Sequence, residues 1–289
     1  MSVSRVLVTG ADGQLAAFIV RAFADREVVR LTRAALDVTD PAAVAATVAA
    51  AAPDLIVNCA AFNDVDGAED RPTETLAINA LAVRSLARAA ETAGAALVHY
   101  STDFVINASG AEPCEEDVRP CPRGVYASSK LLGEWFALEA PRAFVLRVES
   151  LFGSPADWKG RRGTLDHIVD GIEQGREVRV FTDRIVSPSY SKDVAAATKH
   201  LVLSGASPGL YHCVNAGHAS WYDVATEAAE ALGVPPRLVP ITVDQMTLKA
   251  PRPRYCALSI KKLTKAGFEM PTWQDGLRRW LASRTHGLE

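Results

Sequence analysis

The chain has 289 residues, 22% of them charged and 48% hydrophobic, with a formal net charge of −3 and an isoelectric point near 6.1. This length allows a large core, and the charge balance predicts neither a nucleic-acid binder nor a membrane-surface binder. No apolar run approaches the roughly 20 residues that cross a bilayer. The first residues resemble a strand rather than a signal peptide, so we expect a cytoplasmic protein.

The five cysteines show no metal-ligand spacing, and we expect no bound metal. Cys114 and Cys121 fall in one predicted loop. Free thiols are the favoured state of both, because disulfides are scarce in cytoplasmic proteins; a disulfide between them is the alternative.

The N-terminal segment predicts a strand, a glycine turn and a helix. A β-rich run over residues 3–9 ends at Gly10, and an apolar helix is expected over 17–24. Gly10 allows a tight turn, Gly13 lets a pyrophosphate approach the backbone, and Ala16 permits close packing of helix on strand. The free N–H groups of a helix N-terminus attract a phosphate. The segment therefore predicts dinucleotide binding.

The end of the second predicted strand, residues 27–33, bears on which dinucleotide binds. A cofactor with a free ribose 2′-hydroxyl usually meets an acid where this strand ends. Here Thr32 and Arg33 stand there instead. A guanidinium suits a 2′-phosphate, which favours NADPH over NADH. The alternative is that Arg33 is a solvated surface residue.

Strands and helices then alternate along the first half. Asp40 and Pro41 predict the start of a helix that continues over 42–52. Further strands are expected at 54–58, 95–100 and 142–147, and a single helix over 73–93 with a buried apolar stripe that includes Leu76, Leu81 and Leu86. This alternation predicts an α/β fold, a Rossmann-type doubly wound parallel sheet whose ligands lie beyond the carboxyl ends of the strands.

A tyrosine and a lysine stand four residues apart in the helix predicted over residues 124–134. Tyr126 and Lys130 would therefore leave the same face of that helix. A nearby ammonium favours the phenolate, as does a positively charged nicotinamide ring, which would make the tyrosine a usable proton donor at neutral pH. The pair is weak evidence alone, but Gly10, Ala60 and Thr102 at three predicted strand ends place a crevice near it.

The second half is less regular. Strands are expected at 177–181 and 210–214, and helices at 164–174, 192–203, 221–232 and 273–282. We assign residues 1–150 to a dinucleotide-binding domain, and 151–289 mainly to a smaller, interleaved C-terminal substrate lobe with segments that return to the Rossmann sheet. The loop 154–163 carries Lys159, Arg161 and Arg162, which are either a solvated charge run or contacts for a diphosphate.

These motifs together resemble the extended short-chain dehydrogenase/reductases, and most closely the dTDP-4-dehydrorhamnose reductase family. The resemblance covers nearly the whole chain. It is carried by Val8-Thr9-Gly10-Ala11-Asp12-Gly13-Gln14-Leu15, Leu36-Asp37-Val38-Thr39-Asp40, Val57-Asn58-Cys59-Ala60-Ala61-Phe62, His99-Tyr100-Ser101-Thr102-Asp103-Phe104-Val105, residues 124–134, Ser187-Pro188-Ser189-Tyr190, Gly209-Leu210-Tyr211-His212 and Arg252-Pro253.

The resemblance implies a role for each matching residue. The family reduces the C4 ketone of a nucleotide-linked, usually dTDP-linked, 4-keto-6-deoxysugar with a nicotinamide cofactor. The implied catalytic trio is Thr102, Tyr126 and Lys130. The residues implied to hold the cofactor are Gly10, Asp12, Gly13, Gln14 and Leu15 at the pyrophosphate, Asp37 and Val38 at the adenine, and Ala60, Ala61 and Phe62 along its length, with Tyr126 and Lys130. Those implied to face the substrate are Thr102, Asp103, Phe104, the position of Ser150, and Arg252.

The chain departs from the family pattern around the sugar. The family usually has Arg-Thr-Ser-Trp-Val-Tyr-Gly after the fifth strand, where this chain has Arg147-Val148-Glu149-Ser150-Leu151-Phe152-Gly153. A substrate-facing tryptophan is thus replaced by Ser150, and Trp158 is either its substitute or a packing residue. Phe104 replaces a tyrosine. Phe18 stands where some members have a magnesium-binding glutamate, so no such site is expected.

Two other functions are compatible with the sequence. One is a nucleotide-sugar epimerase of the same superfamily. A dehydratase is disfavoured because Asp103 is followed by Phe104, which leaves no second carboxylate in the motif. The other is a non-catalytic regulatory subunit like the β subunit of methionine adenosyltransferase, against which the complete trio argues. The expected partner is a nucleotide sugar, and the expected assembly is a monomer or a homodimer.

Overall fold

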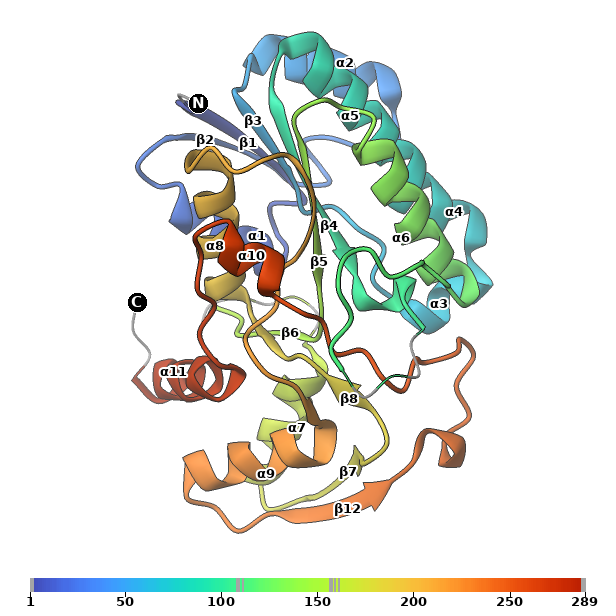
Figure 1. Ribbon diagram of the computed structural model, residues 1–289, viewed down its shortest axis with the longest axis vertical. Helices are drawn as coiled ribbons and strands as arrows, with labels where there is room; N and C mark the ends of the chain where they lie inside the picture. The colour runs from blue at the N-terminus through green and yellow to red at the C-terminus, as the bar shows by residue number, and fades with distance from the viewer. Residues whose placement is uncertain are drawn as a thin grey trace.

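The computed structural model describes residues 3–107, 110, 112–155, 158, 160 and 162–286. A six-stranded parallel sheet in the order β10-β5-β4-β3-β1-β2 forms its centre (Figure 1). The strands are β1 (Arg5–Thr9), β2 (Glu27–Leu31), β3 (Leu55–Asn58), β4 (Ala96–Thr102), β5 (Ala143–Val148) and β10 (Gly209–His212). The predicted Rossmann-type sheet is confirmed.

The central strands are buried on both faces. Every residue of β3, β4 and β5 is buried, as is typical of parallel strands covered by helices on both sides. Within β1, Leu7 pairs with Val29 of β2 on one side and with Ile56 of β3 on the other. The chain thus reverses its direction of travel across the sheet at β1, and ligands of such sheets bind at that switch point.

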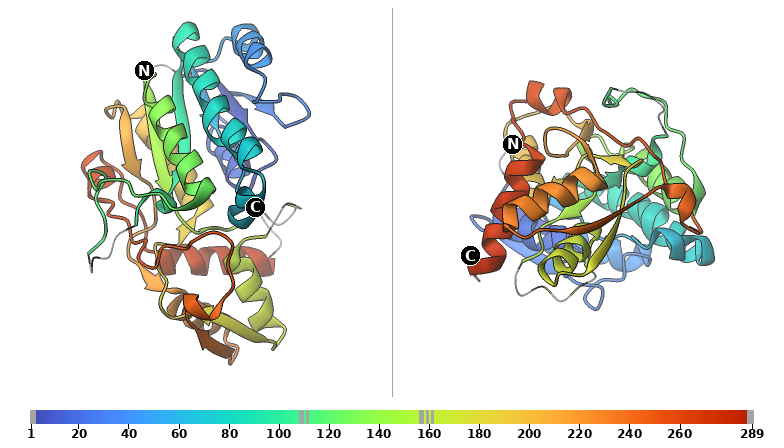
Figure 2. Two further views of the ribbon diagram at one scale, coloured as in Figure 1. Left: turned by 90° about the vertical axis from the view of Figure 1, so that its right-hand side faces the viewer. Right: turned by 90° about the horizontal axis from the view of Figure 1, so that it is seen from below.

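Helices cover both faces of the sheet (Figures 1 and 2). One face carries α1 (Gln14–Ala22) against α8 (Ser191–Leu203); the other carries α2 (Pro41–Ala51), α5 (Ala82–Ala93) and α6 (Gly124–Ala137). The predicted start of α2 is confirmed, since the Asp40 carboxylate accepts hydrogen bonds from the N–H groups of Ala42 and Ala43 at 2.9 and 3.1 Å.

The helix predicted over 73–93 is confirmed, since the chain is helical from residue 72 to 93. It consists of α4 (Pro72–Leu76), a π-helical turn η1 (Ala77–Leu81) and α5, and the short helix α3 (Val65–Asp70) precedes it. The wider π turn changes which residues face inward, so the predicted apolar stripe is wrong: Leu86 is buried, but Leu76 and Leu81 are 37% and 55% exposed. Such turns are frequent at functional sites.

The C-terminal lobe lies below the sheet in Figure 1. Its core is the parallel pair β7 (Glu177–Phe181) and β12 (Arg237–Ile241), covered by α7 (Thr164–Glu173) and α9 (Trp221–Leu232). Four short strands form two further pairs: β6 (Leu151–Phe152) with β9 (Ser189–Tyr190), and β8 (Ile185–Val186) with β11 (Ala219–Ser220). The other described elements are the helical turns η2 (Asp103–Val105), which follows β4, and η3 (Val243–Gln245), and the helices α10 (Lys261–Lys265) and α11 (Trp273–His286).

Two segments of the second half belong to the larger domain: α8 packs on α1, and β10 extends the sheet beside β5. Cys114 and Cys121 are both free thiols, which is the favoured alternative. Among the described residues, no helix combines the length and the apolar character needed to cross a membrane.

Candidate active site

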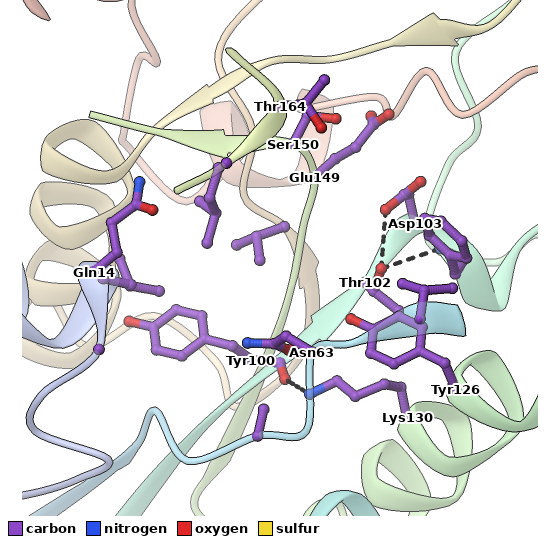
Figure 3. Close-up of a pocket in the computed structure, with 18 of the residues that line it drawn as sticks. Gln14, Asn63, Tyr100, Thr102, Asp103, Tyr126, Lys130, Glu149, Ser150 and Thr164 are labelled. Carbon is purple, nitrogen blue, oxygen red and sulfur yellow. Dashed lines mark hydrogen bonds between the residues drawn. The ribbon is translucent and has the colours of Figure 1, made fainter. Parts of the chain in front are cut away.

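A cavity of about 550 Å³ opens at the carboxyl ends of β3, β4 and β5 (Figure 3). It unites most of the residues that the sequence singled out. Those in its lining are Gly13, Gln14, Leu15, Ala60, Ala61, Thr102, Asp103, Phe104, Tyr126, Lys130, Ser150 and Arg252. Segments from both halves of the chain therefore meet in one space.

The glycine turn has the geometry that a pyrophosphate needs. Gly10 has a φ of +61°, and a Cβ there would lie 2.7 Å from the backbone nitrogen of Ala60, so only glycine fits. The Gly13 N–H closes the turn on the Gly10 carbonyl at 2.9 Å. No side chain caps the start of α1 at Gly13 within the described part of the chain, which leaves its first N–H groups open for an anion. The residues present thus fit a dinucleotide.

Asn58, at the end of β3, is a site residue to which sequence reasoning gave no role. Its side-chain oxygen accepts from the Thr9 hydroxyl at 2.7 Å and from the Ala60 N–H at 3.1 Å. These contacts tie the ends of β1 and β3 together and fix the segment against which Gly10 packs. The signal that could have found it is its position as the only polar residue of a buried strand.

Tyr126 and Lys130 extend into the cavity from one face of α6 (Figure 3). Lys130 donates to the carbonyl of Tyr100, and burial lowers the pKa of its ammonium to about 8. Burial raises the pKa of Tyr126, with a smaller opposing effect from the Thr102 hydroxyl and a further increase from the charge of Asp103. Burial has the largest effect on this pKa, and its lowering by Lys130 and a nicotinamide ring stays a prediction.

Helix α6 is fixed to the sheet by a buried ion pair. Arg147 of β5 binds both carboxylate oxygens of Glu134 on α6, at 2.8 Å each, and the Ser101 hydroxyl donates to the same carboxylate at 2.6 Å. Glu134 follows Lys130 by one helical turn. Burial has the largest effect on the pKa of that lysine and lowers it, whereas the charge of Glu134 raises it. The charge of Glu134 therefore favours the charged form of Lys130 and opposes the effect of burial.

Asn79 in the π turn fixes a second wall of the site. Its side-chain amide accepts from the N–H of Phe62 at 2.8 Å, and it donates to the Phe62 carbonyl and to the Ser129 hydroxyl at 3.0 Å each. The Glu69 carboxylate accepts from the N–H of Val125 at the start of α6, at 2.7 Å. The segment after β3 is thus linked through Asn79 to α6, the helix that carries Tyr126 and Lys130.

Thr102 and its neighbours form the inner end of the cavity. The Thr102 hydroxyl donates to Asp103 at 2.9 Å and accepts from the Phe104 N–H at 3.2 Å. The Phe104 ring meets the Tyr126 ring edge-on, with centroids 5.6 Å apart. Arg252 reaches the same region, but its guanidinium is bound to the Asp66 carboxylate at 2.9 Å.

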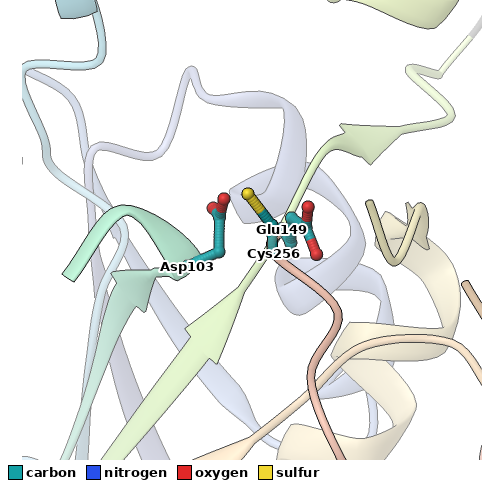
Figure 4. Close-up of side chains that lie close together, drawn as sticks. All are labelled: Asp103, Glu149 and Cys256. Atoms are coloured by element: carbon teal, nitrogen blue, oxygen red, sulfur yellow. The ribbon is translucent and has the colours of Figure 1, made fainter. Parts of the chain in front are cut away.

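Ser150 and Glu149 lie across the cavity from Thr102 (Figure 3). Ser150 lines the cavity with a φ of +45°, a conformation that non-glycine residues rarely adopt and that is often found at functional sites. Buried beside it, one carboxylate oxygen of Glu149, one of Asp103 and the Cys256 Sγ lie within 4.8 Å of one another (Figure 4).

This cluster corrects the inference that no second carboxylate accompanies Asp103. The second carboxylate comes from the end of β5 rather than from the residue after Asp103. Adjacency in the chain was therefore the wrong criterion. The signal was present in the sequence, since Glu149 stands where the family pattern has a serine.

Trp158 lies over the glycine turn. Its indole N–H donates to the Asp12 carbonyl at 2.9 Å, and its ring lines the cavity near Gly13. Arg162 also lines the cavity and forms an ion pair with Asp170 at 2.6 Å. Lys159 and Arg161 lie outside the described residues.

Other predicted cofactor residues do not line the cavity. Gly10 and Phe62 contribute through the turn and the wall just described. Asp37 is exposed, and its carboxylate accepts from the hydroxyl and the N–H of Thr39 at 2.7 and 2.9 Å, which lower its pKa. Val38 is buried, and Arg33 is exposed beyond the end of β2. Their predicted contacts with the adenine half stay predictions.

The fold and this cavity, which is lined by residues of both halves of the chain, are those of a dinucleotide-binding protein. The sequence pattern of the RmlD substrate binding domain family matches residues 4–285, and the chain belongs to that family.

Curated relatives and a solved structure agree with this assignment. The spore coat polysaccharide biosynthesis protein SpsK of Bacillus subtilis is 34% identical over 99% of this chain and 100% of its own length. The dTDP-4-dehydrorhamnose reductase of Mycobacterium tuberculosis is 36% identical over 96% of this chain and 93% of its own. The structure of dTDP-4-dehydrorhamnose reductase from Bacillus anthracis in complex with NADP is similar with a TM-score of 0.91 and 29% identity, covering 98% of this chain and 100% of that one.

Proposed function

We propose that this protein reduces the C4 ketone of a nucleotide-linked 4-keto-6-deoxysugar, that the sugar is dTDP-linked, and that NADPH is the hydride donor. The observation that carries the proposal is the convergence of Thr102, Tyr126 and Lys130 on one cavity beside a glycine turn that fits a dinucleotide. The names of the relatives and the NADP complex of the similar structure support it.

The bound cofactor supplies the hydride that adds to the C4 carbon. As the carbonyl electrons move to oxygen, the Tyr126 hydroxyl, which faces the cavity, donates its proton to that oxygen. Thr102 donates a hydrogen bond to the same oxygen and so stabilises the charge that develops on it. Lys130 is anchored on the Tyr100 carbonyl and would bind the ribose of the nicotinamide half.

The assignment of NADPH rests on Arg33 and on the residues at the end of β2, where no acid stands in the sequence. The guanidinium of Arg33 is exposed there and can bind a 2′-phosphate. The diphosphate of the sugar nucleotide would lie near Arg162 and Arg252, two arginines of the C-terminal half that line the cavity with Arg184.

The test is to follow the consumption of NADPH by absorbance with a set of dTDP-linked 4-keto-6-deoxysugars. We expect one NADPH to be oxidised per sugar reduced. Binding of NADPH without turnover of any sugar would favour the regulatory-subunit alternative. A change of sugar configuration without oxidation of NADPH would favour the epimerase.

A further inference from the structure

The inner end of the cavity holds a pair of buried acids. Asp103 and Glu149 are 3% and 2% exposed. Each has one oxygen that is held by a donor: Thr102 donates to Asp103 at 2.9 Å, and the N–H of Ser187 donates to Glu149 at 2.7 Å. The other oxygen of each carboxyl group is buried and has no hydrogen-bond partner within the described part of the chain.

The two carboxyl groups are close enough to repel each other strongly when both are ionised. An oxygen of each lies within 4.8 Å of the other and of the Cys256 Sγ. A thiol is a weak donor, and that of Cys256 also meets the Pro253 carbonyl at 3.5 Å, so it offers the acids little compensation. Two charges cannot be buried at this separation without a large cost, so the pair retains one proton.

The charges that face the pair are few. Burial raises the pKa of both carboxyl groups, and the charge of Asp103 raises that of Glu149 further, whereas Arg184, from the segment between β7 and β8, lowers both. Cys256 stays a neutral thiol, because burial and the two acids raise its pKa. On the side of α6, the pair faces Tyr126, whose pKa burial raises first and the charge of Asp103 raises further.

We propose that Glu149 is a positioning residue for the reduction: it keeps one proton on its pair with Asp103 and thereby lowers the negative charge that would otherwise act on Thr102 and Tyr126. This inference rests on the proposed function. A carboxyl group that carries the proton part of the time is a weaker acceptor, so the Thr102 hydroxyl can leave Asp103 and turn to the substrate oxygen. The same loss of charge makes Tyr126 a better acid.

The proposal predicts that kcat falls as the pH rises. The retained proton follows from the pair itself, because two buried carboxyl groups this close, each with an oxygen that has no donor in the described part of the chain, do not both ionise at neutral pH. As the pH rises through the apparent pKa of the pair, the second carboxylate ionises, Asp103 holds the Thr102 hydroxyl, and kcat falls. Lys130 also titrates on this side, so only a comparison of variants isolates the pair.

The test compares the pH profiles of kcat at saturating NADPH for the wild type, Glu149→Gln and Asp103→Asn. In Glu149→Gln, Arg184 faces a single acid and keeps Asp103 ionised at neutral pH, so kcat should fall about 10-fold or more there and recover as the pH is lowered. The Asp103→Asn variant has no charge at this position, so the alkaline fall caused by the pair should disappear from its profile. The readout is the shape of the plot of kcat against pH, because the amide side chain of either variant can also change KM.

Glu116→Gln is the matched control. Glu116 is a partly buried acid whose pKa burial also raises, and it binds the N–H of His212 outside the cavity. Its replacement should leave the profile unchanged. Identical profiles for the wild type, Glu149→Gln and Asp103→Asn would overturn the proposal, as would a profile that changes on addition of EDTA, since a bound cation would then occupy the cluster.

Infrared spectroscopy provides a readout that needs no turnover. The wild type should show the carbonyl band of a protonated carboxyl group at neutral pH. Both single variants should lack it, because Arg184 then faces only one acid. If no sugar is reduced but the band is present and is lost in both variants, the proposed function fails and the retained proton stands. If sugars are reduced but the band is absent, the retained proton is refuted alone.

Discussion

Replacing Glu134 with glutamine should destabilise this protein more than any exposed charge change. The Glu134 and Arg147 side chains are 3% and 1% exposed, and both carboxylate oxygens bind the guanidinium. The variant keeps the shape of the side chain but leaves a guanidinium buried without its counter-charge. Breaking one side of a buried pair costs about 3–5 kcal/mol, a large part of the roughly 5–15 kcal/mol that holds a typical protein folded.

Urea unfolding followed by circular dichroism measures this loss, with an unchanged slope showing that the unfolded state is unaffected. The matched control is Glu74→Gln, which removes an exposed glutamate 3.4 Å from Arg71 and should cost less than about 1 kcal/mol. A Glu134→Leu, Arg147→Met double variant should recover much of the loss, because apolar replacements leave no buried charge. A loss below about 1 kcal/mol for Glu134→Gln, the range of an exposed pair, would refute the argument.

Three further changes test the site. Tyr126→Phe should lower kcat by about 10²-fold or more with little change in the Kd of NADPH, and retained activity would remove Tyr126 from its role. In fluorescence titrations, Arg33→Ala should lower the affinity for NADPH far more than the affinity for NADH. The control is Arg30→Ala, at a residue that lines a neighbouring cavity. If Arg30→Ala lowers the affinity for NADPH more than Arg33→Ala does, the 2′-phosphate is bound by Arg30 and the assignment to Arg33 is wrong. Lys130→Met should raise the free energy of unfolding at pH 7 by about 3 kcal/mol, because burial lowers the lysine pKa to about 8. The unfolded chain binds the lysine proton more tightly than the folded one, so the difference in unfolding free energy between the variant and the wild type should shrink as the pH rises towards about 10. A difference that does not change with pH would contradict the burial argument.

Local patterns were sufficient for the parts of the site that lie within one segment. The turn at Gly10 and Gly13 and the spacing of Tyr126 and Lys130 depend on residues that are neighbours in one strand–turn–helix or on one helix face. Parallel strands end at the same edge of a sheet, so alternation of strands and helices was also enough to bring Thr102 to the same crevice.

Features that depend on contacts between distant segments could not be predicted in this way. The π turn around Asn79 is stabilised by hydrogen bonds to Phe62 and Ser129, which no local propensity encodes. The approach of Cys256 to Asp103 and Glu149 depends on how the C-terminal segment returns to the sheet, whereas the two acids follow paired residues of the neighbouring strands β4 and β5. The pKa of Tyr126 depends on burial, which spacing along a helix does not reveal.

Among the buried acids that the structure describes, Glu134 differs from the pair Asp103 and Glu149 in a way that separates scaffold from chemistry. Every oxygen of Glu134 has a donor, so its charge belongs to the packing of α6 on β5. Asp103 and Glu149 each keep an oxygen without a donor in the described part of the chain, so their burial weakens the fold rather than supports it. Glu149→Gln should therefore be no less stable than the wild type in urea while it loses activity, the opposite of a scaffold residue. Destabilising residues at an active site are retained for what they do in the reaction.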